Sequence, residues 1–284
     1  MTAKKTKKDP QEMSFLDHLE ELRWHLIRST LAVVIIAAVA FVFRRFLFDI
    51  IIFGPTHAEF VSYDILCRIS SIFGLEKGCI GEGDLDFIVQ SRKVAGQFNA
   101  AIWTAITTGV VLGFPYILYE FWKFISPGLY AKERKHSRGF IIIASLLFFT
   151  GVTFGYYVIA PLSVNFLSGF KVSSEIQNEF DIDSYIALVR ASVLAAGFIF
   201  ELPIVIYFLT KIGLVTPAFL RKYRKYALVL VLILSAIITP PDVSTQIIVA
   251  VPILILYEVS IHISRIVVRR EKKRMKAQGI TDYN

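Results

Sequence analysis

Charged side chains and cysteines are scarce in this sequence. Charged residues make up 19% of the 284 residues, against about 25% in soluble domains, whereas hydrophobic residues make up 55%. A soluble fold of this length cannot bury so much apolar surface in a single core. Two cysteines exclude a disulfide-dense scaffold. A chain so rich in apolar residues is also not expected to be intrinsically disordered.

Catalytic motifs are absent as well. The sequence contains no HExxH zinc motif, no GxSxG nucleophile motif and no GxxxxGK[ST] phosphate loop. Its five histidines and two cysteines are scattered without the spacing of metal ligands. We therefore predict a protein that is not an enzyme and that holds no metal or other cofactor.

Long apolar stretches are what the sequence does contain, with a mean hydropathy of +0.59. We predict one all-α, polytopic membrane domain over 1–284. Its six transmembrane helices are expected at about 24–43, 95–119, 139–162, 186–210, 226–239 and 243–262. The fifth and sixth are short: 226–239 reaches only about 21 Å as a helix, against an apolar core of about 30 Å. Either the bilayer is thinner there or the pair forms a shallow hairpin.

Basic residues are unevenly distributed between these helices. Of the 31 Lys and Arg, 22 lie in four segments on one side of the predicted helices. These segments are 1–23, 121–139, 211–226 and 263–284. Since positive charge concentrates on the cytoplasmic side, both termini are predicted to be cytoplasmic, and 263–284 a basic cytoplasmic tail. The net charge of +8 therefore reports orientation and does not indicate nucleic acid. No cleavable signal peptide is evident, so the first helix is expected to be a retained anchor.

A long loop at 44–94 is predicted on the opposite, periplasmic side. It contains both cysteines, Cys67 and Cys79. If that side is oxidising, the two can form a disulfide; otherwise they are two free thiols.

The N-terminal segment shows helical periodicity before the first span. Ser14 and Asp17 resemble a capping box, and apolar residues from Phe15 onward share one face. This predicts a short amphipathic helix along the membrane interface that runs into the first span. Glu21 lies on its polar face. Taken alone, that carboxylate is equally well explained as a solvated acidic residue at a helix start.

Aromatic residues cluster in 114–135, as in a membrane-interface belt, and Phe124 is one of them. Pro127 and Gly128 predict a turn. Glu133 follows among basic residues, and the simplest explanation for it is an exposed ion pair of little energetic value.

Glu201 lies inside the fourth predicted span, just before Pro203. A carboxylate there costs a few kcal/mol, so it is expected to face protein, water or a partner. The alternative is a structural hydrogen bond within the helix bundle.

The segment 239–246 predicts a sharp turn between the last two helices. Pro240 and Pro241 cannot continue a helix, and Asp242 or Ser244 can cap the next one. Turn chemistry alone accounts for this segment, including Gln246.

Four segments in this order resemble the TatC family, the multispanning subunit of the twin-arginine protein translocase. They are 15–23 (FLDHLEELR), 115–133, 200–203 (FELP) and 239–246 (TPPDVSTQ). The resemblance covers nearly the whole chain, and the outer loop at 44–94 looks longer than the family pattern. The resemblance implies a concave bundle of six helices in the bacterial cytoplasmic membrane.

The resemblance also implies roles for individual residues. Glu21 and Glu133 are carried over as the carboxylates that recognise Arg-Arg signal peptides of folded cargo, with Arg23 and Phe124 beside them. Glu201 is carried over as a contact to single-span partner helices of the TatA/TatB type. Transport driven by the proton-motive force fits the missing nucleotide motif, and more than one copy of the chain is expected in the complex.

Two other classes remain as alternatives. A secondary transporter of a small solute would explain six spans and Glu201, but it predicts inverted repeats that the sequence does not display. An intramembrane enzyme would need a catalytic constellation that is missing.

Overall fold

Helices form most of the structure, a computed structural model that describes residues 15–57, 60–72, 87–125, 137–173, 175–176 and 178–277. The chain divides into two compact units. Unit 1 contains 1–47 and 101–146, and unit 2 contains 48–100 and 147–284.

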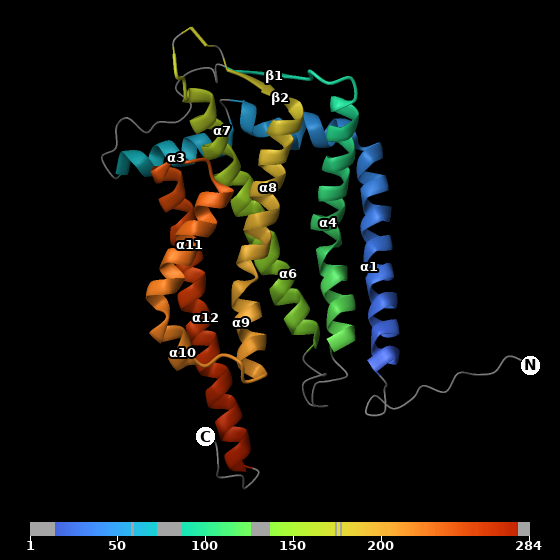
Figure 1. The fold of residues 1–284 in the computed structure, drawn as a ribbon, viewed down its shortest axis with the longest axis vertical. Coiled ribbons are helices and arrows are strands. Elements are labelled where there is room, and N and C mark those ends of the chain that lie inside the picture. The colour runs from blue at the N-terminus through green and yellow to red at the C-terminus, as the bar shows by residue number, and fades with distance from the viewer. Residues whose placement is uncertain are drawn as a thin grey trace, which may run out of the picture. The chain divides into compact units, whose positions relative to one another are not determined.

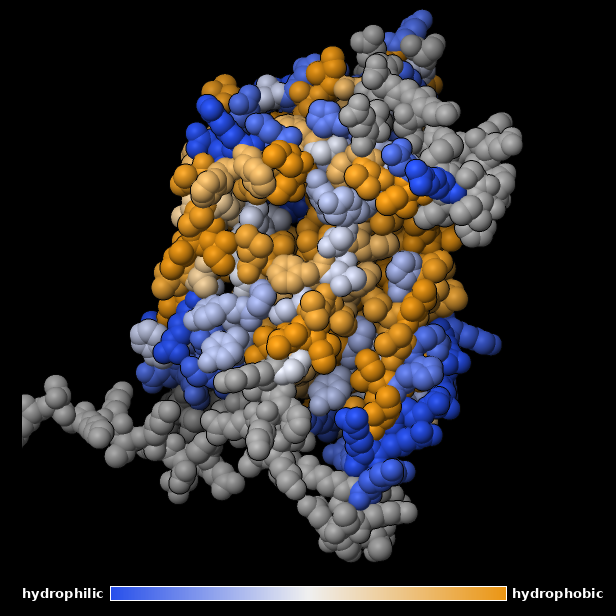
Figure 2. Space-filling view, turned by 180° about the vertical axis from the view of Figure 1, so that it is seen from behind, coloured by the Kyte–Doolittle hydropathy of each residue, from blue (hydrophilic) through white to orange (hydrophobic). Residues whose placement is uncertain are grey.

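Five helical segments of the described chain are long and apolar enough to cross a membrane. On the face seen in Figure 2, apolar side chains cover most of the middle of the helices and hydrophilic ones gather towards their ends. This agrees with a polytopic membrane protein. The five segments are Leu19–Val42, Gly96–Ile125, Gly139–Gly169, Ile182–Lys211 and Thr245–Lys273.

In unit 1, helix α1 (Phe15–Val42) lies beside helix α4 (Gly96–Ile125), as Figure 1 shows. A Cβ atom added to Gly109 of α4 would lie 2.6 Å from the carbonyl oxygen of Val33 in α1. Only glycine allows the two backbones to approach so closely, as small residues do between membrane helices.

Both helices differ from the predicted bounds. The amphipathic segment is not a separate element, since α1 runs without interruption through a stretch that has neither glycine nor proline. Helix α4 continues past the predicted end at 119 to Ile125. The prediction was wrong because Glu120 was treated as the end of the apolar run, although glutamate is a good helix former.

The third span is longer than predicted and is built in three parts. Helix α6 (Ser137–Phe154) continues through a wider turn, η6 (Gly155–Ile159), into α7 (Ala160–Gly169). Pro161 does not end this span at 162, because it lies in the first turn of α7, where a missing N–H is tolerated.

A seam of three glycines joins this span to α8 (Ile182–Phe200) within unit 2. A Cβ on Gly151 would lie 2.5 Å from the carbonyl oxygen of Ala196, and one on Gly155 would lie 2.5 Å from that of Ser192. From the α8 side, a Cβ on Gly197 would lie 2.8 Å from the Phe148 ring. The backbones therefore pack against each other almost directly.

The fourth span is interrupted at Glu201. Helix α8 ends at Phe200 and α9 (Leu202–Lys211) begins directly after Glu201. Pro203 has no N–H to donate to the preceding turn, so the hydrogen-bond ladder cannot pass this point unchanged. The span also starts at Ile182, earlier than the predicted 186.

The last two helices differ in length. After α10 (Pro217–Lys222), α11 (Arg224–Ile238) has 15 residues, about 22 Å, as short as predicted. By contrast, α12 (Val243–Ala277) has 35 residues, so the prediction of a short sixth helix ending near 262 was wrong. The basic residues beyond 262 change the polarity of the helix but do not break it, because Lys and Arg are good helix formers.

The segment predicted as a long loop at 44–94 contains ordered structure. Its helical elements are α2 (Arg44–Phe46), η2 (Leu47–Ile52), η3 (Gly54–Thr56) and α3 (Val61–Ile72). Strand β1 (Ile88–Gln90) pairs in parallel with β2 (Glu179–Asp181), with Val89 opposite Phe180. This two-stranded sheet is an exception to the predicted all-α class.

Candidate functional site

Glu21 and Arg23 lie in the second turn and third turn of α1, near its N-terminal end. Glu21 is half-buried, whereas Arg23 is exposed. The neighbouring Glu20 is exposed. The two consecutive carboxylates of the motif are therefore not equivalent, and Glu21 is the more buried of the two.

One helical turn after Glu21, a buried ionisable pair joins α1 to α4. His25 is 7% exposed and Glu120 is 3% exposed, and His25 Nδ1 is hydrogen-bonded to Glu120 Oε2. The Tyr116 hydroxyl donates to the other carboxyl oxygen, Oε1, over 3.1 Å. Both oxygens of this buried carboxylate thus have partners.

Phe124 lies beside this pair. Its ring meets the His25 ring edge-on, with centroids 6.2 Å apart. Since Phe124 follows Glu120 by one turn of α4, and His25 follows Glu21 by one turn of α1, these four residues lie within about one turn of one another along their helices. Phe124, one of the predicted site residues, therefore lies near the end of the 15–23 segment of α1.

Sequence reasoning missed His25 and Glu120. The signal was present, because Glu120 stands in a strongly apolar stretch where an acid needs a partner. Because the predicted span ends at 119, Glu120 is predicted to lie outside the membrane, where an acid needs no partner. The second predicted recognition carboxylate, Glu133, lies outside the described residues, so the convergence of two acids stays a prediction.

Glu201 lies at the junction of α8 and α9 in unit 2. The residue is 8% exposed, and its buried Oε1 atom has no hydrogen-bond partner among the residues that the structure describes. The carboxyl group has a hydrogen bond with the backbone of Phe148 in α6. Within this chain, Glu201 is thus much less well satisfied than Glu120.

The turn at 239–246 is built as the sequence suggested, with Asp242 as the cap of α12. Its Oδ2 accepts from the Thr245 amide at 2.8 Å and from the Thr245 hydroxyl at 2.7 Å. Gln246 donates from Nε2 to the carbonyl oxygen of Leu232 in α11, at 2.9 Å. Pro240 and Pro241 separate the two helices. The geometry accounts for a tight hairpin.

Two other site predictions are untested. Cys79 lies outside the described residues, so the pairing with Cys67 stays open. Among the described residues, no group of three or more His, Cys, Asp or Glu is placed to hold a metal ion.

Comparison with known proteins decides the family. The chain matches the family model for "Sec-independent protein translocase protein (TatC)" over residues 17–252. The chain belongs to the TatC family. All four resembling segments lie within this range except Phe15 and Leu16 at the start of the first.

Relatives and solved structures agree. A TatC of Blattabacterium sp. subsp. Periplaneta americana is 43% identical over 91% of this chain and 97% of its own length. The TatCy protein of Bacillus subtilis is 33% identical over 96% of both chains. Two crystal structures of the twin-arginine translocase receptor TatC match at TM-scores of 0.64 and 0.68, with 32% and 33% identity. They cover 88% and 87% of this chain and 99% of theirs.

Proposed function

We propose that this TatC-family chain is the receptor subunit of a twin-arginine translocase and binds Arg-Arg signal peptides of folded cargo at the cytoplasmic face. Membership of the family supports the translocase role. The structural observation that carries the binding site is the position of Glu21, one turn from a buried pair that fixes α1 against α4.

The chemistry of recognition follows from the shape of the guanidinium group. It is planar and permanently charged, and it donates two parallel hydrogen bonds to one carboxylate. Two adjacent arginines need two acids, and Glu21 and Glu133 supply them. Lysine cannot form the fork. Phe124, beside His25, offers a ring on which a guanidinium can stack.

The basic surroundings add selectivity. Arg23 is exposed two residues from Glu21, and Lys123 precedes Phe124. Cationic segments that do not engage both acids are repelled by these charges. A signal peptide with two correctly spaced arginines compensates for that repulsion by two charge-assisted pairs.

For the topology, we infer six crossings of a bacterial cytoplasmic membrane with both termini in the cytoplasm. The uneven distribution of the 31 basic residues supports this. Helix α11 would then be the fifth crossing, about 22 Å long, which thins the adjacent bilayer.

For the partners, we infer single-span helices of the TatA/TatB type that contact the chain at Glu201. A carboxyl group with an unsatisfied buried oxygen favours any partner that brings a hydrogen-bond donor. Several copies of the chain then assemble with these partners, and the proton-motive force drives export.

The test is crosslinking in membranes that contain the full complex. A photoreactive residue replaces Leu22, which is 38% exposed and next to Glu21. An Arg-Arg signal peptide is expected to crosslink, and Glu21→Ala or Glu133→Ala is expected to abolish it while the chain still inserts. Glu20→Ala is the matched control, because Glu20 is exposed on the same helix. Unchanged crosslinking in both test variants would contradict the proposed site.

A further inference from the structure

Helix α3 has no role in the proposed function. It lies in the segment 44–94 and has 12 residues, with apolar residues at 61, 65, 69 and 72 in the sequence. Asp64 and Arg68, one turn apart, border this apolar stripe along one edge, and Arg68 lies next to Val61. This is the spacing of an amphipathic helix.

The start of α3 is fixed to the rest of unit 2. Tyr63 is 1% exposed, and its hydroxyl donates to the carbonyl oxygen of Pro55 over 2.7 Å. Burial raises the pKa of that hydroxyl. Just before α3, the Phe60 ring stacks on Tyr157 and meets Tyr156 edge-on, with centroids 5.5 and 5.6 Å apart. The helix is therefore held at its first turn by aromatic packing and a buried hydrogen bond.

The opposite side of this first turn is apolar and exposed. Val61 is 59% exposed and Ile65 is 51% exposed, one turn apart. Asp64 and Arg68 are exposed beside them. Amphipathic helices of soluble proteins bury their apolar side, but here Tyr63 and Ser62 are buried and two β-branched aliphatic side chains are not.

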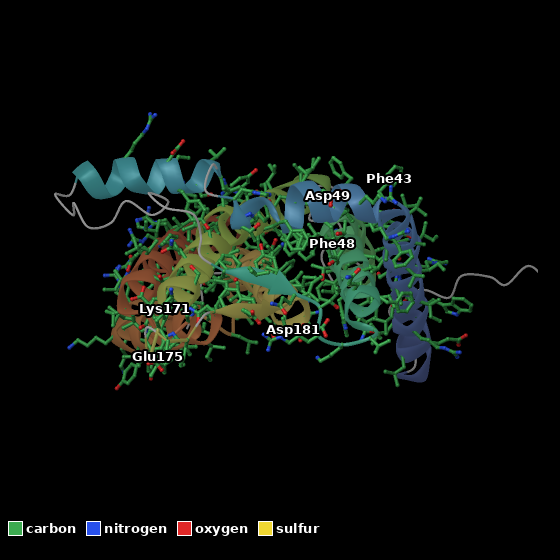
Figure 3. The ribbon with its side chains drawn as sticks, turned by 90° about the horizontal axis from the view of Figure 1, so that it is seen from above. Phe43, Phe48, Asp49, Lys171, Glu175 and Asp181 are labelled. Atoms are coloured by element: carbon green, nitrogen blue, oxygen red, sulfur yellow. The ribbon has the colours of Figure 1, made fainter. Side chains whose placement is uncertain are left out.

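The direction of α3 identifies what covers this side. In Figure 1, α3 runs across the view, whereas α7, α8, α11 and α12 run along it. Seen from above in Figure 3, α3 lies outside the group formed by these helices. Since helices of unit 2 cross the membrane, a helix transverse to them at one end and outside their outline lies parallel to the membrane plane.

We propose that α3 is an interfacial helix that docks on the lipid surface, with Val61 and Ile65 in contact with the acyl-chain boundary. Asp64 and Arg68 then face the headgroups and water. Exposed apolar side chains beside a polar stripe are the pattern of helices that lie in this layer. The bilayer takes the place of a protein partner, and α3 anchors the outer segment of unit 2 to the membrane. This inference does not depend on signal-peptide binding.

Tryptophan fluorescence in nanodiscs tests the proposal. Ile65→Trp is compared with Asp64→Trp, because both positions are exposed but point about 100° apart around the axis of α3, one within the apolar stripe and the other beyond its polar edge. The parent chain, which has three tryptophans, supplies the baseline. In phosphatidylcholine brominated on its acyl chains, the emission added at 65 is expected to fall by about half or more, and that at 64 to change little.

The other outcomes overturn the proposal. If neither added tryptophan is quenched, α3 lies away from the bilayer. If both are quenched equally, the helix has no lipid-facing side of the kind inferred here. A second measurement excludes local unfolding as a cause: hydrogen exchange of the α3 amides must be the same in Ile65→Trp and in the parent. Ile65→Asp is expected to speed that exchange in nanodiscs, and unchanged exchange would also contradict membrane docking.

Discussion

Glu120 lies within an apolar helix and Glu201 at the joint between two, and both are buried to a similar degree, yet their carboxyl groups differ in hydrogen bonding. Glu120 in unit 1 is 3% exposed, with His25 on one carboxyl oxygen and Tyr116 on the other. Glu201 in unit 2 is 8% exposed, and within the described part of the chain its Oε1 atom has no hydrogen-bond partner. The degree of burial alone therefore does not indicate the role of a carboxyl group in a membrane-spanning segment.

The hydrogen bonds that each carboxyl group makes within its own chain distinguish two possible roles, packing within the chain and contact with a partner. A carboxyl group whose oxygens are all engaged contributes to the packing of its own chain. A carboxyl group left partly unsatisfied costs free energy within the single chain, and a partner that brings a donor recovers some of that cost. On this argument, Glu120 joins α1 to α4, whereas Glu201 has the property that the proposed assembly role requires.

The largest expected effect is on the stability of unit 1. Glu120→Leu leaves the buried His25 ring without its partner, so unfolding in detergent is expected to become easier by about 3 kcal/mol. The double variant His25→Leu, Glu120→Leu removes both polar groups and is expected to recover much of this loss. Thermal unfolding curves of the three proteins give the comparison. Equal stability of the single variant and the parent would show that the pair has no structural role.

Glu201 is expected to behave in the opposite way. Glu201→Leu removes an unsatisfied buried group, so the isolated chain is expected to be as stable as the parent or more stable by about 1 kcal/mol. Co-purification of single-span partners is expected to fall severalfold, while signal-peptide crosslinking persists. Glu201→Gln, which keeps a donor and an acceptor, serves as the conservative control. Partners recovered at unchanged yield with leucine would contradict the assembly role.

Glu21 is half-buried and is expected to affect binding alone. Glu21→Ala removes one charge-assisted pair, so affinity for an Arg-Arg signal peptide is expected to fall about tenfold or more. The unfolding midpoint should stay within experimental scatter of the parent. Peptide titration in nanodiscs measures the affinity, and replacing both arginines of the peptide with lysine should weaken binding to the parent protein.

The smallest effect is expected for an exposed pair. Lys93 Nζ lies 3.1 Å from Asp183 Oδ2, and the hydrogen bond and charge of Asp183, with the charge of Asp181, raise the pKa of Lys93. The pair is formed at neutral pH and is lost as the pH rises through that raised pKa. Because water screens it, Lys93→Ala should leave the unfolding midpoint unchanged at pH 7. A clear shift would mean that an ion pair exposed to water also stabilises the fold, so that burial would not be needed for a pair such as His25–Glu120 to do so.

Apolar length and turn chemistry made much of the fold predictable. Spans emerge from long apolar runs, and Pro240 with Asp242 specifies where α12 begins. Helix ends were less predictable, because a charged residue such as Glu120 ends an apolar run without ending a helix. The basic residues after His262 show the same effect in α12.

Pairings distant in sequence account for what could not be predicted. His25 and Glu120 are 95 positions apart, and nothing in the local pattern links one with the other. The parallel pairing of β1 with β2 joins segments about as distant. Such contacts depend on tertiary packing, whereas Glu21, Phe124 and Glu201 were selected from local motifs and the family resemblance.

The glycine seam between the third span and α8 has a mechanical consequence. Carbonyl oxygens of Ala196 and Ser192 occupy the space that side chains would take at Gly151 and Gly155. Helices seated so closely cannot slide along each other without a steric clash. Glu201 follows Gly197 by one turn, where the hydrogen-bond ladder is already interrupted. The tight seam therefore ends one turn before Glu201, and the direction of the chain beyond this carboxyl group is set by the packing of α9 against α12, which includes the hydrogen bond from the Thr210 hydroxyl to Ser264.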